Sequence, residues 1–144
     1  MGEPITVFDE EAKRCRKLLT AFGVPRDSLR ILEKRLPYRN YLAEMARHKI
    51  VLQADKSSVP GQVAGDALLC HLPCLGGDGT IDRLAFPAIC GYGRSLGELQ
   101  ELAARLLREP DFYEETIVQS QALARDRLSF EAVAPQLAAF FAKL

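Results

Sequence analysis

Residues 49–79, KIVLQADKSSVPGQVAGDALLCHLPCLGGDG, constrain the fold of this chain more than any other stretch. The apolar run at 50–54 predicts a strand, and 64–72 predicts a helix. Cys74–Leu75 begins a second strand, which ends in the glycine-rich turn at 76–79. A strand–helix–strand unit is typical of a parallel sheet, and such sheets bind ligands at the carboxyl ends of their strands. The loop KSSVPGQ follows the first strand, so we expect a nucleotide or phosphate there.

Apolar periodicity, capping residues and turn residues predict the other elements of the chain. We expect strands at Ile5–Phe8, Leu29–Leu32, 50–54, Cys74–Leu75 and 88–92, and helices after Asp9, at 38–47, at 64–72, after Ser95, at 111–124 and at 130–144. This alternation predicts an α/β fold: a three-layer, doubly wound, Rossmann-like parallel sheet of five strands in the order 2-1-3-4-5, with the strand at 50–54 in its centre. The length favours a single domain, 1–144, with 94–144 as a helical extension packed on the sheet.

Composition narrows the classes of function. The chain has 19 Lys and Arg residues against 19 Asp and Glu residues, so it has no large basic field and we expect no nucleic-acid partner. No apolar run approaches the roughly 20 residues of a membrane span, and the N-terminus MGEPITVFDEE has no signal-peptide pattern. We therefore expect a cytoplasmic protein without a membrane span. Cys70, His71 and Cys74 lack the spacing of a zinc site, so we expect buried thiols, no metal and no cofactor.

From Pro37 onward, the order of the motifs resembles a known family. The motifs read YRNYLAEMARH, KIVLQAD, SSVPGQVAGDALLCHLP, CLGGDGTIDRLAFP, SLGELQELAARLL, REPDFYEE and LSFEAVAPQLAAFF. This series is similar to the C-terminal, nucleotide-sugar-binding domain of the retaining GT-B glycosyltransferases (glycosyl transferases group 1, family 4). The resemblance implies that the ligand is a nucleoside diphosphate or a nucleotide sugar.

Two departures from the family bear on activity. Family members carry a spaced pair of glutamates, and matching through Pro73 places that pair on Ser58 and Asp66. Asp66 keeps the carboxylate that would bind ribose hydroxyls, whereas Ser58 lacks the acid that faces the sugar. The family's N-terminal acceptor domain and its basic opening unit are also not in this sequence. The resemblance therefore implies donor binding without catalytic residues, and a separate acceptor domain or a second copy as a partner.

The candidate ligand contacts gather around the expected strand ends. Unpaired N–H groups and the dipole of a helix N-terminus attract a diphosphate, and a glycine lets the backbone approach it closely. The candidate nucleotide-sugar-binding residues are Ser57, Ser58, Pro60, Gly61, Gln62, Asp66, Gly77 and Asp78, with Lys34 and Arg35 flanking the base or phosphate. For each group a plain alternative stays open: a capped turn for the first loop, a buried or surface acid for Asp66, an ordinary turn for GGDG, and solvated surface charge for the two basic residues.

Two other functions compete with donor binding. A response-regulator receiver shares the 2-1-3-4-5 order, and Asp55 at the end of the third strand would be its phosphoacceptor. Asp9 and Glu10 would bind Mg²⁺, but only Arg94 follows the fifth strand, where a receiver has a lysine. We therefore expect no phosphorylation at Asp55. The third function is a non-catalytic interaction domain derived from a glycosyltransferase.

Overall fold

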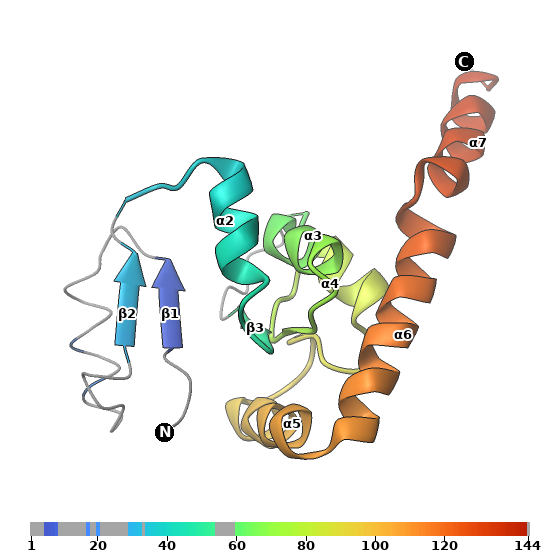
Figure 1. The fold of residues 1–144 in the computed structure, drawn as a ribbon. Coiled ribbons are helices and arrows are strands. Elements are labelled where there is room, and N and C mark those ends of the chain that lie inside the picture. Colours follow the sequence, from blue (N-terminus) through green and yellow to red (C-terminus); the bar gives the residue numbers. More distant parts are fainter. Residues whose placement is uncertain are drawn as a thin grey trace. The chain divides into compact units, whose positions relative to one another are not determined.

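The computed structural model describes residues 5–8, 17, 20, 29–32, 34–53 and 60–143. Its residues form two compact units, Met1–Asn40 and Tyr41–Leu144. Figure 1 labels the helices and strands of both units. Within the described ranges, no helix has the length and apolar character needed to cross a membrane.

The first unit contains two of the expected strands. β1 (Ile5–Phe8) and β2 (Leu29–Leu32) pair in parallel, with Ile5 opposite Leu29 and Phe8 opposite Leu32. Both strands have the predicted bounds. Of the helix expected after Asp9, only Lys17 and Thr20 belong to the described residues, and both are helical.

The second unit contains the expected strand–helix–strand. β3 (Val51–Leu52) and β4 (Cys74–Leu75) pair in parallel, with Val51 opposite Cys74, and α3 (Gln62–Leu69) connects them. One backbone hydrogen bond continues past the pair, since the N–H of Gln53 donates to the carbonyl of Leu75 at 2.9 Å. The carboxyl ends of both strands therefore meet at one edge, as the sequence predicted.

Helices make up the rest of the second unit. α2 (Tyr38–Met45) extends into it from residue 41 onward. The others are α4 (Thr80–Ala85), α5 (Leu96–Arg108), α6 (Pro110–Leu128) and α7 (Phe130–Phe141). Ser95 and Ser129 accept hydrogen bonds from the first-turn amides of α5 and α7, and Pro110 occupies the first turn of α6, where its missing N–H costs nothing. α5 and α7 thus begin at the predicted residues, and α6 begins one residue before the predicted start.

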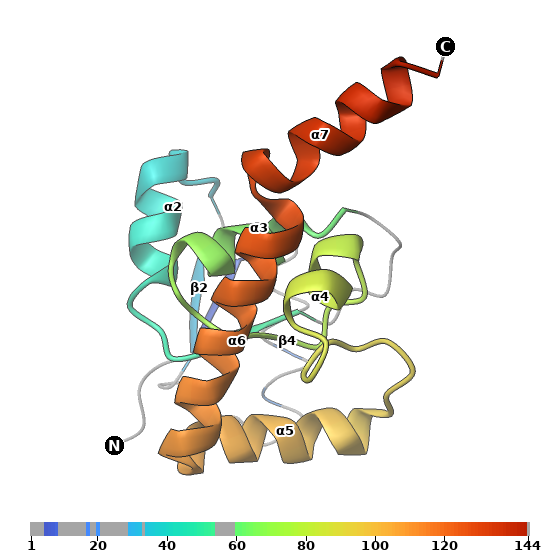
Figure 2. The ribbon, with the colours of Figure 1, turned by 90° about the vertical axis from the view of Figure 1, so that its right-hand side faces the viewer.

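One core of buried side chains joins β3 and β4 to helices α2 to α6 among the described residues. Its buried side chains are Met45, Ala64, Ala67, Leu72, Cys74, Leu75, Ala85, Phe86, Ile89 and Leu106. α6 packs against α3, α4 and α5, and it runs across the front of the unit in Figure 2. Two side chains tie it to the strand–helix–strand: Tyr113 donates to the carbonyl of Lys49 at 2.9 Å, and Gln121 donates to the carbonyl of Leu68 at 2.9 Å. The long helix α6 is therefore attached to the residues just before β3 and to the end of α3.

The predicted five-stranded sheet is wrong. The described strands form two separate two-stranded parallel sheets, β1–β2 and β3–β4, and the fold is mostly helical. β3 and β4 have only two residues each, so the order 2-1-3-4-5 and the central place of 50–54 are both overturned. Short strands offer few ladder hydrogen bonds, and the packing of helices supplies most of the burial instead.

The expected strand at 88–92 is also wrong, for a reason that is visible in the hydrogen bonds. The amides of Ile89 and Cys90 both donate to the carbonyl of Phe86, at 3.0 and 2.8 Å. Amides committed to these tight turns cannot also donate to a neighbouring strand. A short helix, α4, takes up the chain between β4 and these turns, and the sequence analysis did not predict it.

Candidate functional site

Two glycine-containing loops meet at the carboxyl ends of β3 and β4. We call these loops, residues 60–62 and 76–79, the glycine edge. The carbonyl of Pro60 accepts a hydrogen bond from the N–H of Ile81 at 3.0 Å, which joins the start of α3 to the start of α4. The structure therefore brings together Pro60, Gly61, Gln62, Gly77 and Asp78 from the predicted site.

Gly61 ends the first loop and begins α3. Its φ of 91° lies in the left-handed region, which a residue with a side chain rarely adopts. The next residue, Gln62, opens the helix with its side chain exposed. The first N–H groups of an α-helix have no partner within the helix, and the dipole makes this end favourable for an anion. This helix N-terminus is the place where the sequence predicts a diphosphate contact.

A buried carboxyl group lies beneath the glycine edge. Asp82 is 0% exposed, and its Oδ2 accepts a hydrogen bond from the N–H of Gly79 at 3.1 Å. Its Oδ1 accepts one from Cys74 Sγ at 3.8 Å, and Cys74 also lies 3.9 Å from Gln53 Oε1. The sequence analysis missed this residue, although an acid three residues after Gly79 is the pattern of a helix first turn.

Burial controls the ionisation of this pair. Removal from water raises the pKa of the Asp82 carboxyl, and the hydrogen bond from Gly79 opposes that rise only in part. Burial also raises the pKa of the Cys74 thiol, and the nearby Asp82 charge raises it further. The thiol therefore stays protonated and serves as a hydrogen-bond donor to Asp82 rather than as a nucleophile.

Asp66 lies one helical turn after Gln62 in α3. It is buried in the middle of α3. Burial raises the pKa of Cys70, one turn further on the same helix face, and the charge of Asp66 raises it further. Cys70 Sγ in turn lies 3.6 Å from the carbonyl of Leu42 in α2. This face of α3 is therefore directed towards α2, whereas Gly65 on the adjacent face lies next to Ile81 of α4.

The remaining predicted residues are placed as follows. Ser57, Ser58 and Asp55 lie outside the described residues. Lys34 and Arg35 are exposed and belong to the first unit, whereas the glycine edge belongs to the second. Across the described ranges, no group of three or more His, Cys, Asp and Glu side chains is arranged to hold a metal ion.

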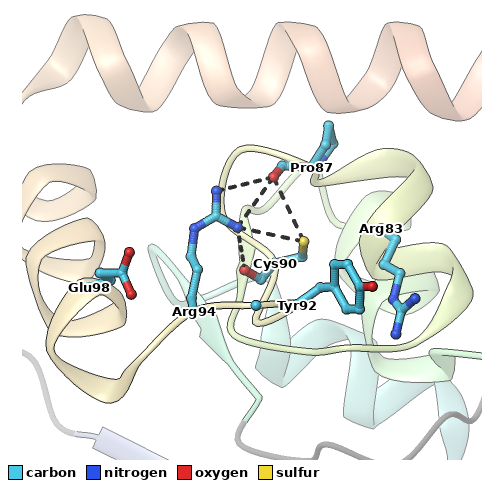
Figure 3. A pocket seen from close by; sticks show the side chains of 7 residues that line it. Arg83, Pro87, Cys90, Tyr92, Arg94 and Glu98 are labelled. Atoms are coloured by element: carbon cyan, nitrogen blue, oxygen red, sulfur yellow. Dashed lines mark hydrogen bonds between the residues drawn. The ribbon is translucent and has the colours of Figure 1, made fainter.

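A pocket of about 490 Å³ adjoins the glycine edge (Figure 3). It is lined by Arg83, Pro87, Cys90, Tyr92, Gly93, Arg94 and Glu98. Arg83 connects the two places, because its Nε binds Asp78 Oδ1 at 2.8 Å while its guanidinium stacks on the Tyr92 ring at 3.8 Å. Arg94 donates to the carbonyl of Cys90 at 2.7 Å. The sequence analysis missed this pocket because it assigned residues 88–92 to a strand.

The charges around the pocket balance. Asp78 offsets Arg83, and Glu98 follows Arg94 closely enough that the arginine helps to lower the pKa of that glutamate. The pocket therefore presents no excess of positive charge to an anion. The Tyr92 ring and the two arginines of the pocket mainly contact the segment between α4 and α5.

Comparison with protein-family models, with curated proteins and with solved structures finds no match to this chain.

Proposed function

We propose that this chain binds the diphosphate of a nucleotide sugar at the glycine edge, as the donor-binding domain of a glycosyltransferase does. The observation that carries the proposal is that Gly61, at the N-terminus of α3, and Gly77, which follows β4, both lie against the Asp82 side chain. Both belong to one parallel strand–helix–strand unit, the arrangement whose strand ends bind ligands in α/β proteins.

The chemistry of this edge suits a diphosphate rather than a neutral ligand. Backbone N–H groups at the start of α3 are donors that need no charged side chain. The motifs from Pro37 onward, which resemble the retaining GT-B glycosyltransferases, favour a nucleoside diphosphate over free phosphate. The backbone donors at the start of α3 are the reason why we place the diphosphate at the glycine edge and not in the neighbouring pocket.

The receiver function is not proposed. It needs a cationic side chain presented by a fifth strand, and residues 88–92 form turns instead. Arg94, the only candidate for that cation, is held by the carbonyls of Cys90 and Pro87.

Replacing Gln62 by glutamate tests the proposal without weakening the helix. A carboxylate in the first turn of α3 is favourable for the helix dipole, so Gln62→Glu leaves stability unchanged or slightly raised. The same charge repels a bound diphosphate. At a separation of about 4 Å in a watery setting the repulsion is at least about 1 kcal/mol, which corresponds to roughly fivefold weaker binding.

The measurement is the dissociation constant for UDP, GDP and ADP by titration calorimetry. Gln100→Glu, an exposed position in α5, makes the same charge change away from the edge and is the matched control. We expect weaker binding for Gln62→Glu and unchanged binding for Gln100→Glu. Equal affinities for both variants and the unmodified chain would place the diphosphate elsewhere.

A further inference from the structure

The buried carboxyl of Asp82 lies between the two loops of the glycine edge. A Cβ atom added to Gly77 would overlap Asp82 Oδ1, and one added to Gly61 would lie 2.7 Å from Asp82 Oδ2. Both distances are shorter than any ordinary contact of a Cβ atom. The two glycines therefore lie against opposite oxygens of the same carboxyl group.

Asp82 also binds the loop that carries Gly77. The N–H of Gly79 donates to Oδ2 at 3.1 Å, and the thiol of Cys74, at the start of β4, donates to Oδ1. Removing the carboxyl would leave the buried Gly79 amide without the acceptor that Asp82 gives it, which is costly, and would leave the thiol with Gln53 Oε1 as its acceptor. It would also open a space between the loops that neither glycine can fill.

We propose that Asp82 is the positioning residue of the glycine edge: it sets the spacing between Gly61 and Gly77 without contacting the ligand. The importance of that spacing for a diphosphate rests on the proposed function, whereas the spacing itself is a property of the unliganded chain. A displacement of either loop would move the backbone donors away from the phosphate oxygens, and small misplacements weaken binding strongly.

An acid rather than an apolar residue is suited to this place because two donors face it. The titratable groups that act on Asp82 among the described residues are Cys74 on β4 and Asp78 in the turn. Asp78 is paired with Arg83, the neighbour of Asp82 on α4. Asn has the same shape as Asp and keeps one acceptor oxygen, so it can replace the carboxyl without loss of the bond from Gly79.

The test compares Asp82→Asn with Asp82→Ala in two readouts. The first is the amide resonances of Gly61, Gly77 and Gly79 in the unliganded chain, measured by ¹H–¹⁵N NMR. The second is the dissociation constant for whichever of UDP, GDP and ADP the unmodified chain binds. We expect Asp82→Ala to shift all three resonances and to weaken binding by tenfold or more, and Asp82→Asn to keep both close to those of the unmodified chain.

Leu106→Ala is the control for a general loss of stability, because Leu106 is a core residue of α5, 2% exposed, away from the edge. It should lower stability and leave the affinity and the three resonances unchanged. An unliganded Asp82→Ala chain with unshifted Gly61 and Gly77 resonances would overturn the proposal, as would an equal loss of affinity in Leu106→Ala. If the unmodified chain binds no nucleotide, the proposed function fails, and the resonances alone still decide the role of Asp82.

Gly77→Ala serves if Asp82→Ala does not fold. The added methyl group must displace the Asp82 carboxyl, so we expect the Gly61 resonance to shift although Gly61 is distant in sequence. Gly97→Ala in α5, whose added Cβ would have only Ser95 Oγ at 4.0 Å, is the matched control and should leave the Gly61 resonance in place. An unmoved Gly61 resonance in Gly77→Ala would contradict the coupling through Asp82.

Discussion

Cys74 and Cys70 are close in sequence and differ in their surroundings. Cys74 is 0% exposed and donates to Asp82, whereas Cys70 is partly exposed at the end of α3. The thiolate is the species that reacts with alkylating reagents, so burial and a raised pKa both slow the reaction. Burial raises the pKa of Cys70 as well, but water and reagent can reach its thiol because the residue is only partly buried.

We therefore predict that iodoacetamide labels Cys70 in the folded chain at pH 8 and leaves Cys74 unlabelled until the chain unfolds. Peptide mass spectrometry after timed exposure measures both sites in one sample, and labelling in urea gives the rates for the accessible thiols. The raised Cys74 pKa also means that stability falls as the pH rises above the ordinary cysteine range, because the unfolded thiol ionises first. Equal labelling rates for both cysteines in the folded chain would contradict the buried Cys74–Asp82 pair.

At this scale the sequence predicts part of the site. Gly61 and Gly77 could be placed at one edge because their positions after the strands follow from the strand–helix–strand pattern. Asp82 could not be placed there, because an acid beside an arginine in the segment TIDRLAFP is typical of an exposed helix face. The burial of Asp82 arises only from the packing of α4 under the two loops. The sequence predicted that Asp66 lies on the helix between the two strands. The neighbour that the Asp66 face of this helix packs against depends on where α2 lies.

At the scale of elements, the C-terminal helices were predicted best. Residues at the helix starts specify where these helices begin. Ser95 and Ser129 accept hydrogen bonds from first-turn amides, and Pro110 occupies a position where no N–H is required. Strands β3 and β4 were located correctly, but Val51–Leu52 is shorter than the apolar run that predicted it. The strand predicted at 88–92 was wrong because a short apolar run after a helix and a short buried strand have similar compositions.

The capping box of α5 offers a test of this local coding. Ser95 Oγ accepts from the N–H of Glu98 at 3.3 Å, and Glu98 Oε2 accepts from the N–H of Ser95 at 2.8 Å. We predict that Ser95→Ala lowers stability by about 1 kcal/mol. Ser95→Thr keeps the hydroxyl and should stay close to the unmodified chain.

Thermal unfolding followed by circular dichroism checks the prediction, with an expected decrease in Tm of roughly 4 °C for Ser95→Ala. The hydrogen bonds from Ser95 hold the pKa of Glu98 below its usual range. The contribution of this carboxylate is therefore present above the ordinary glutamate pKa and is lost as the pH falls through the lowered value. The difference between Ser95→Ala and the unmodified chain should shrink in acid, and a difference that grows in acid would argue against the capping box.

At the scale of the whole molecule, the local unit was predicted and the sheet was not. Each strand–helix–strand is specified by neighbours in sequence, whereas the order of strands in a sheet depends on contacts between distant segments. Two-residue strands carry too few ladder bonds to fix that order. The long helix α6, tied to Lys49 and Leu68 through Tyr113 and Gln121, takes over much of the support that a larger sheet would give.

Binding of a nucleoside diphosphate at the glycine edge is tested most directly by ¹H–¹⁵N NMR of the full chain titrated with UDP, GDP and ADP. We predict that at least one of the three shifts the amide resonances of Gly61, Gln62, Gly77 and Asp78 in a saturable manner at concentrations up to about 1 mM. Resonances of α7, such as Leu137, should stay in place and serve as the internal control. Shifts confined to residues away from the two loops, or no shift with any of the three nucleotides, would contradict the proposed function.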